Sequence, residues 1–176
     1  MLRGEKMTIK KRDEIDKKYK WNIEAMYPDE SKWERDIEEC RKKAEEFTKL
    51  KGTITKSAEN LHRALTMRDE IFKLFEHALV YSYMKKDEDN RESKYQGMAD
   101  KAGMIAAKIS AEMSFFAPEL LSASEETIKG FIAEKPELKI YEFSLLDALR
   151  EKEHVLSASE ENILVGFKLE KIVFLG

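Results

Sequence analysis

The fold is decided by residues 57–116, which read SAENLHRALTMRDEIFKLFEHALVYSYMKKDEDNRESKYQGMADKAGMIAAKISAEMSFF. Apolar side chains recur in this stretch at alternating steps of three and four residues, the spacing of one face of an α-helix. In the first half these are Ala64, Met67, Ile71, Leu74, Ala78 and Tyr81, and in the second half Tyr95, Met98, Ala102, Ile105, Ile109, Met113 and Phe116. The polar residues 85–90 separate the halves. The pattern predicts two long antiparallel helices, about 57–86 and 89–116, joined by a turn.

Shorter helical patterns flank this hairpin. One helix is expected from Ser31 to about residue 51, with Gly52 as its stop, and a short helical turn is expected over 118–121. Two more amphipathic helices are expected over 127–135 and 137–152, separated by Pro136. We therefore predict an all-α protein, an antiparallel helical bundle centred on the hairpin.

Local signals predict how these helices begin. Ser57 with Asn60 suits the start of the first arm, and Asp87 or Asp89 can cap the second. An aromatic-rich patch before the first helix is expected to anchor the chain onto the body through its large side chains, which are Trp21, Ile23, Met26 and Tyr27.

The hexapeptide LSASEE occurs twice, at 121–126 and at 156–161. Each copy offers a capping box, Ser122 with Glu125 and Ser157 with Glu160. A tandem helical repeat would also produce two copies of one hexapeptide, but the first 120 residues show no sequence repeat with the same spacing. Reuse of a good helix cap is the favoured interpretation.

Composition excludes several classes of protein. The chain has 176 residues, enough for one sizeable domain, and a formal charge of only -3 with both signs interspersed. Nucleic-acid binding is not expected, because it needs a basic stripe. No apolar run is long enough to span a membrane. Cys40 is the only cysteine, so an intrachain disulfide is impossible, and we expect a soluble cytoplasmic protein.

The titratable side chains do not form a recognisable active site. No two of the three histidines, His62, His77 and His154, have the i, i+4 spacing that brings two imidazoles to one metal. Cys40 lies on an apolar helical stripe, where a buried thiol is expected rather than a nucleophile. The acidic run 87–89 lacks the glycine and terminal glutamate of a calcium loop. No catalytic, cofactor-binding or metal-binding residue is therefore predicted.

Sulfur and aromatic side chains near the end of the hairpin leave two possibilities open. They could form an adaptable binding face, or they could belong to the core, as is usual at helical spacing. The residues concerned are Met98, Met104, Met113, Phe115 and Phe116.

Several short motifs, taken in order, resemble one family. They are Arg12-x-Glu14, Tyr19-Lys20-Trp21-Asn22-Ile23, Met26-Tyr27, Trp33, Tyr81-x-Tyr83, Asp87-Glu88-Asp89-Asn90, Phe115-Phe116-x-Pro118-Glu119-Leu120-Leu121, Tyr141, Arg150-x-Lys152-x-His154-x-Leu156-Ser157 and Glu160-Glu161. Over about 12–166 the chain resembles the N-terminal region of oligoendopeptidase F, a zinc metallopeptidase of the thimet oligopeptidase type.

The resemblance implies a helical lobe that faces a catalytic lobe across a peptide-binding cleft. In the family, zinc is held by an H-E-x-x-H helix and a later Glu, and this sequence has no H-E-x-x-H. We expect a flexible arm at 1–11, the lobe at 12–166 and a divergent tail at 167–176. This divergence suggests a product truncated by a frameshift, an interrupted gene or design.

The expected function is therefore a non-catalytic part of an oligopeptidase, with zinc only in the full-length family. The alternative is a stand-alone helical module that binds peptides or a protein. Partners expected on this basis are the missing catalytic lobe or a second copy of the chain, in a twofold dimer.

Overall fold

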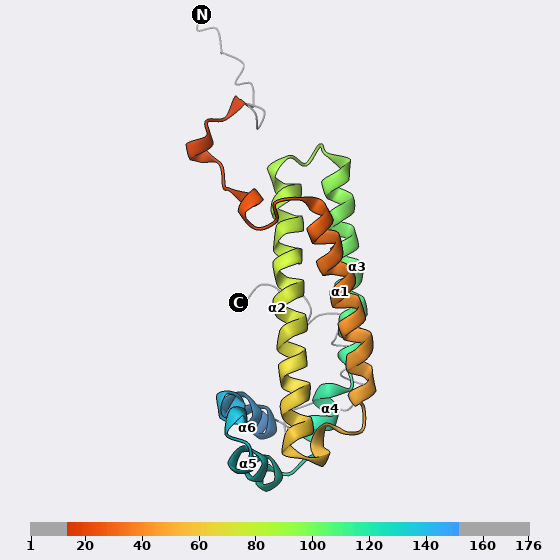
Figure 1. Cartoon of the computed structure of the whole chain (residues 1–176), viewed down its shortest axis with the longest axis vertical. Coiled ribbons are helices and arrows are strands. Elements are labelled where there is room, and N and C mark those ends of the chain that lie inside the picture. Colours follow the sequence, from red (N-terminus) through yellow and green to blue (C-terminus); the bar gives the residue numbers. More distant parts are fainter. Residues whose placement is uncertain (1–13, 152–176) are drawn as a thin grey trace, which may run out of the picture. The chain divides into compact units, whose positions relative to one another are not determined.

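The computed structural model describes residues 14–151, and every regular element in that range is helical (Figure 1). The α-helices are α1 (Glu30–Phe47), α2 (Ala58–Glu88), α3 (Ser93–Met113), α4 (Phe116–Leu121), α5 (Glu125–Glu134) and α6 (Glu142–Glu151). Short 3-10 helices lie between them: η2 (Lys17–Tyr19), η3 (Ile23–Ala25), η4 (Thr48–Leu50), η5 (Ile54–Lys56) and η6 (Pro136–Tyr141). The predicted all-α class is confirmed.

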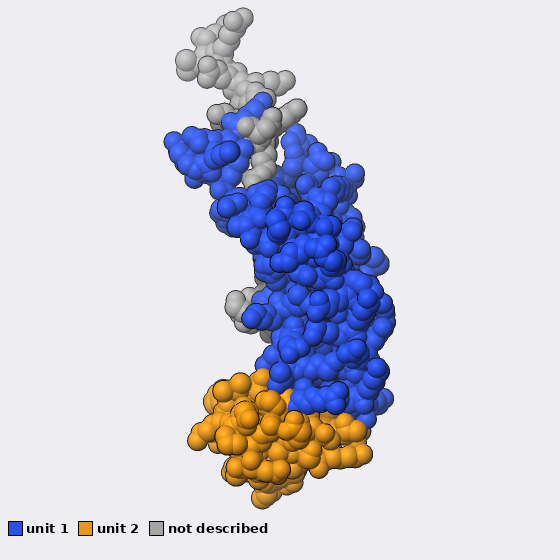
Figure 2. All heavy atoms as spheres, in the orientation of Figure 1, with its two compact units in different colours: residues 1–51, 63–115 blue, residues 52–62, 116–176 orange. Residues whose placement is uncertain are grey.

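The chain divides into two compact units (Figure 2). Unit 1 comprises residues 1–51 and 63–115, and unit 2 comprises 52–62 and 116–176, each considered only where the structure describes it. Helix α2 begins in unit 2 and continues in unit 1. The predicted arm at 1–11 and tail at 167–176 lie outside the described residues, so the predicted domain boundaries stay a prediction.

Unit 1 is built from α1, α2 and α3, which lie side by side in Figure 1. Helix α1 begins at the cap residue Asp29, whose carboxylate accepts from the Lys32 amide at 3.0 Å. Its buried stripe is Trp33, Ile37, Cys40, Ala44 and Phe47, as its helical spacing indicates. The indole Nε1 of Trp33 donates to the carbonyl of Ala78 and to the hydroxyl of Ser82, both at 2.9 Å. These bonds fix α1 against α2.

The turn between α2 and α3 differs from the prediction. Residues 85–88 are still helical, and the turn is confined to 89–92. Neither proposed aspartate caps α3. Asp87 belongs to α2, while Asp89 accepts from the Arg91 amide at 3.0 Å inside the turn, and the cap position falls on Glu92, without a side-chain cap bond. The second arm also ends early, at Met113, because Phe116 begins α4.

The predicted N-terminal anchor is only partly correct. Ile23 and Tyr27 are buried, and the Tyr27 hydroxyl donates to Asp36 of α1 at 2.8 Å. Trp21, however, is 74% exposed. Ile23 and Tyr27 therefore anchor this segment through buried side chains, whereas the side chain of Trp21 is largely exposed.

Unit 2 is organised by a carboxylate that bridges a loop. Glu119 of α4 accepts from the backbone amides of Gly52 and Ile54, each at 2.7 Å. Gly52 has φ +75°, a conformation that glycine adopts without strain, and it lies just after η4 as the predicted stop. Ser57 is confirmed at the start of α2, where its hydroxyl accepts from the Asn60 amide at 3.2 Å.

Two details of unit 2 correct the sequence analysis. The cap of α5 is Ser124, which accepts from the Thr127 amide at 3.1 Å, whereas Ser122 closes α4 by donating to the carbonyl of Glu119. The helix expected over 137–152 is divided into η6 and α6. The second copy of the capping box, Ser157 with Glu160, lies outside the described residues.

Candidate functional site

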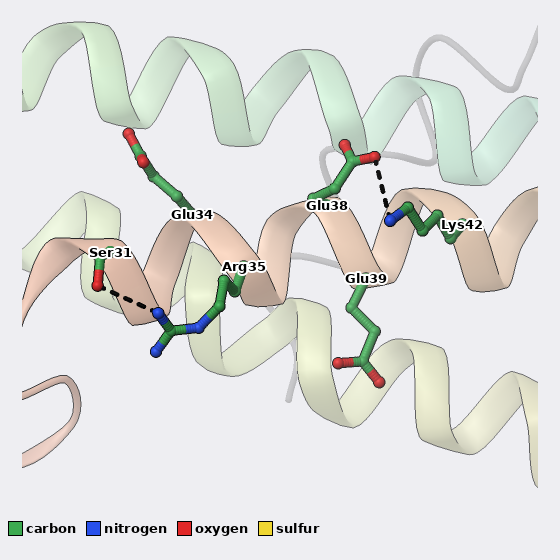
Figure 3. Close-up of a pocket in the computed structure, with 6 residues that line it drawn as sticks. All are labelled: Ser31, Glu34, Arg35, Glu38, Glu39 and Lys42. Carbon is green, nitrogen blue, oxygen red and sulfur yellow. Dashed lines mark hydrogen bonds and ion pairs between the residues drawn. The ribbon is translucent and has the colours of Figure 1, made fainter.

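The outer face of α1 carries a shallow hollow of about 550 Å³ in unit 1 (Figure 3). All its lining residues are exposed and come from this one helix: Ser31, Glu34, Arg35, Glu38, Glu39 and Lys42. In Figure 3, Glu39 extends on the opposite side of the helix from Glu34 and Glu38. A hollow lined by a single helix is a surface feature rather than a cleft that encloses a substrate.

Charges in and around this hollow largely compensate one another. Glu38 accepts from Arg41 at 2.7 and 2.9 Å, and the Lys42 ammonium lies 3.9 Å away. The hydrogen bond from Arg41 lowers the pKa of Glu38. Arg35 donates to the Ser31 hydroxyl at 3.3 Å. The Ser31 hydroxyl itself donates to the carboxylate of Asp29, the cap residue of α1, at 2.5 Å, so its contacts are those of a helix start.

A buried cation lies elsewhere in unit 1. The Lys85 side chain is 9% exposed, and its Nζ lies 2.7 Å from Glu24 Oε1 and 3.6 Å from Glu88 Oε2. The same ammonium lies 5.9 Å from the ring centroid of Tyr81 and 5.6 Å from that of Tyr95. This arrangement joins the N-terminal segment, α2 and α3, and its carboxylate and aromatic contacts are those of a structural cation.

The sequence analysis missed this cluster because it placed Lys85 in a polar turn. A signal was present, however. The buried face of α2 runs through Ala78, Tyr81 and Ser82, and Lys85 continues it at the next helical step. A lysine that falls on an apolar stripe indicates a buried ion pair.

The predicted burial of Cys40 is confirmed, since the side chain is 0% exposed in the core of unit 1. Burial raises the pKa of its thiol to about 12, with a smaller contribution from Asp36. A thiol is unreactive under these conditions, because the thiolate is the nucleophile.

The candidate histidines do not meet. His62 belongs to unit 2, whereas His77 lies in unit 1, with its ring centroid 4.7 Å from that of Tyr27. His154 is outside the described residues. Among residues 14–151, no three His, Cys, Asp or Glu side chains are grouped so that they could hold a metal ion. The described residues therefore do not fit the zinc that the resemblance implies for the full-length family.

The methionine and phenylalanine set does not form one face. Met98, Met113 and Phe116 are buried, whereas Met104 is 67% exposed. The core interpretation holds for the first three residues. Within the part of the chain that the structure describes, no helix is long and apolar enough to cross a membrane.

Comparison with known sequences gives a consistent result. A family model described as Oligopeptidase F matches residues 119–169. The chain is 32% identical over 153 residues to oligopeptidase PepF of Bacillus subtilis, which covers 87% of this chain and 23% of that protein. It is 31% identical over 155 residues to the group B oligopeptidase PepB of Streptococcus agalactiae, covering 88% of this chain and 26% of that protein. The chain thus spans about a quarter of the length of these relatives.

Comparison with solved structures agrees. The crystal structure of oligoendopeptidase-F from Enterococcus faecium matches with a TM-score of 0.69 and 27% identity, over 78% of this chain and 27% of that one. The helical fold and the partial coverage agree with a helical region that makes up about a quarter of these longer proteins. The chain belongs to the oligoendopeptidase F family and corresponds to the N-terminal region of its members. The family predicted from the sequence motifs is confirmed.

Proposed function

We propose that the chain acts as the substrate-confining helical lobe of an oligoendopeptidase F-type zinc metallopeptidase and hydrolyses no peptide by itself. The observation that carries this proposal is the match, over about a quarter of their length, to relatives whose names state that they are oligopeptidases. The described residues offer no metal-binding group, and the sequence has no H-E-x-x-H. Hydrolysis would therefore depend on a catalytic lobe that brings its own zinc.

The test is a peptidase assay on the purified chain with internally quenched fluorescent peptides, together with measurement of bound zinc. We expect no hydrolysis and no stoichiometric zinc. Hydrolysis that a chelator abolishes would contradict the proposal, because it would require a metal site within this chain. The family's catalytic lobe is the partner expected on this basis, and a cytoplasmic location is part of the same proposal, in keeping with a single cysteine.

A second candidate is a stand-alone helical module that binds peptides or a protein. Ile140 and Phe143 favour it, because both are large apolar residues and are 80% and 75% exposed. Fluorescence anisotropy with labelled peptides separates the two candidates. Saturable binding by the isolated chain, without cleavage, would favour the module, and no binding would favour a lobe that needs its catalytic counterpart.

A further inference from the structure

The surface beside α6 in unit 2 combines exposed apolar side chains with opposite charges. Phe143 and Leu146 border a hollow of about 370 Å³ that is also lined by Glu125, Glu142 and Arg150. Phe143 is 75% exposed, and Ile140, at the end of the preceding η6, is 80% exposed. Apolar side chains of this size, rimmed by charges, are typical of an interaction surface.

The order of these residues along α6 decides what fits the surface. Glu142, Leu146 and Arg150 follow one another at steps of four, so they form a single stripe along the helix, with Phe143 beside it. The carboxylate belongs to the first residue of α6, and the guanidinium lies near its last turn. At ~1.5 Å per residue the two charged positions are about 12 Å apart. The apolar side chain of Leu146 is midway between them.

Such a stripe is complementary to itself. When a helix meets its own copy across a twofold axis that is perpendicular to the helix, the two copies run antiparallel. Each residue then faces the residue that is equally far from the axis on the other side. With Leu146 at the centre, Glu142 of each copy faces Arg150 of the other copy. The geometry points to a homodimer in which α6 packs antiparallel against α6 of a second copy, closed by two Glu142–Arg150 ion pairs and covering Phe143.

The present contacts of these charges are compatible with this pairing. Arg150 donates to Asp147 of the same helix at 2.7 Å, but its side chain is 64% exposed. A guanidinium has five N–H donors, so Arg150 can keep Asp147 and also reach a carboxylate on a second copy. Glu125, the other acidic residue of the hollow, lies 2.6 Å from Lys129. Glu142 also lies within the electrostatic influence of Lys129, but it is the carboxylate that shares the stripe with Arg150 and can therefore face Arg150 of the second copy.

The dimer should be weak. Helix α6 has ten residues, and stable specific interfaces generally bury at least about 1,200 Å² of total surface. We therefore expect a concentration-dependent monomer–dimer equilibrium rather than a permanent dimer.

Sedimentation equilibrium on the full 176-residue chain tests the inference with variants in which the charges of Glu142 and Arg150 are reversed. The wild type should associate reversibly between about 10 μM and 1 mM. Glu142→Arg and Arg150→Glu should each weaken association by at least about tenfold, because like charges then face one another. An equimolar mixture of the two single variants should associate again, since every facing pair in the mixed dimer is once more of opposite sign. The double variant E142R/R150E should associate for the same reason.

An apolar variant gives a second, independent measurement. Phe143→Ser should weaken association, whereas Met104→Ser, which removes a side chain that is 67% exposed in unit 1, should not. Circular dichroism melting verifies that each variant is folded. If a charge variant is not folded, the association of Phe143→Ser still tests the dimer. A wild type that remains monomeric, as it would if another part of the polypeptide or another protein covered this face, overturns the inference. So does a mixture of the charge variants that associates no better than either variant alone.

Discussion

The indole Nε1 of Trp33 donates to the hydroxyl of Ser82 at 2.9 Å, and that hydroxyl donates in turn to the carbonyl of Ala78 at 2.7 Å. Both side chains are buried, and the indole also donates to the Ala78 carbonyl at 2.9 Å, so the indole, the hydroxyl and the carbonyl form one buried hydrogen-bonded group. Trp33→Phe removes the donor and some of the packed volume. We expect the free energy of unfolding, measured by urea denaturation, to fall by about 1–3 kcal/mol. Trp21→Phe is the matched control and should change it little, because Trp21 is 74% exposed.

The carboxylate of Glu119 should be difficult to replace even by its amide. It accepts from two backbone amides, of Gly52 and Ile54, and Gln offers only one acceptor oxygen. One of the two N–H groups would then face an NH₂ group, so Glu119→Gln should lower the free energy of unfolding by about 1–3 kcal/mol. Glu134→Gln, at an exposed position of α5, serves as the control. Equal stability of the two variants would show that the bridge contributes nothing.

Two glycines should respond to alanine with opposite signs. Gly52 has φ +75°, where a Cβ is strained, so Gly52→Ala should destabilise the protein by about 1–2 kcal/mol. Gly103 lies inside α3, and a Cβ built there meets nothing within 4 Å. Gly103→Ala should therefore stabilise by up to about 1 kcal/mol through helix propensity. Thermal melting of the two variants measures both shifts, and shifts of the same sign would contradict this explanation.

The buried ammonium of Lys85 should matter more than an exposed one. Lys85→Met takes a cation away from Glu88, whose side chain is 11% exposed, and should lower the free energy of unfolding by about 1–3 kcal/mol. Combining it with Glu88→Gln should recover part of the loss, because residue 88, which is largely buried, then carries no charge that lacks its cation. Lys73→Met, at an exposed position of the same helix, is the control. A double variant less stable than additivity predicts would argue against the ion pair.

The thiol of Cys40 predicts a loss of stability at high pH. Burial raises its pKa to about 12 in the folded protein, from an ordinary value of 9.0. Above pH 9 the unfolded chain loses this proton and the folded chain keeps it, so the free energy of unfolding falls as the pH rises towards 12. Cys40→Ala should reduce this slope by up to about 1.4 kcal/mol per pH unit. Urea denaturation at a series of pH values below 10.0, the ordinary pKa of the likewise buried Tyr27, measures the difference.

The helices could be predicted because their apolar residues recur regularly over many turns. The stripe of α1 from Trp33 to Phe47 is buried as its spacing indicates, and Ser57 caps α2 as its position suggests. A long pattern predicts a helix even where single residues are ambiguous, because every apolar residue on the stripe favours burial of the same helix face.

The ends of the helices could not be predicted as well, because neighbouring polar side chains compete for the same capping positions. Ser122 and Ser124 are two residues apart and equally suited to cap α5, but Ser122 is already committed to the end of α4. Asp89 likewise turns towards Arg91 instead of capping α3. Lys85 shows a further limit, because its place on the buried face of α2 indicates an ion pair but does not identify the partner, Glu24, which lies 2.7 Å away. That partner is 61 positions away in sequence.

The family of the chain was available from sequence motifs, but the α6 surface was not. Leu145 and Leu149 of α6 are buried. Ile140 of η6 and Phe143 of α6 are exposed, and each lies two residues from a buried leucine, Leu138 and Leu145 respectively.

Neither compact unit is a continuous piece of polypeptide, because residues 52–62 belong with 116–176 while 63–115 belong with 1–51. A single cut therefore cannot separate the two units. A cut after residue 115 leaves 52–62 attached to unit 1, and a cut after residue 51 leaves 63–115 attached to unit 2. Isolating either unit for study would require joining its two segments by a new linker in place of the segment that belongs to the other unit.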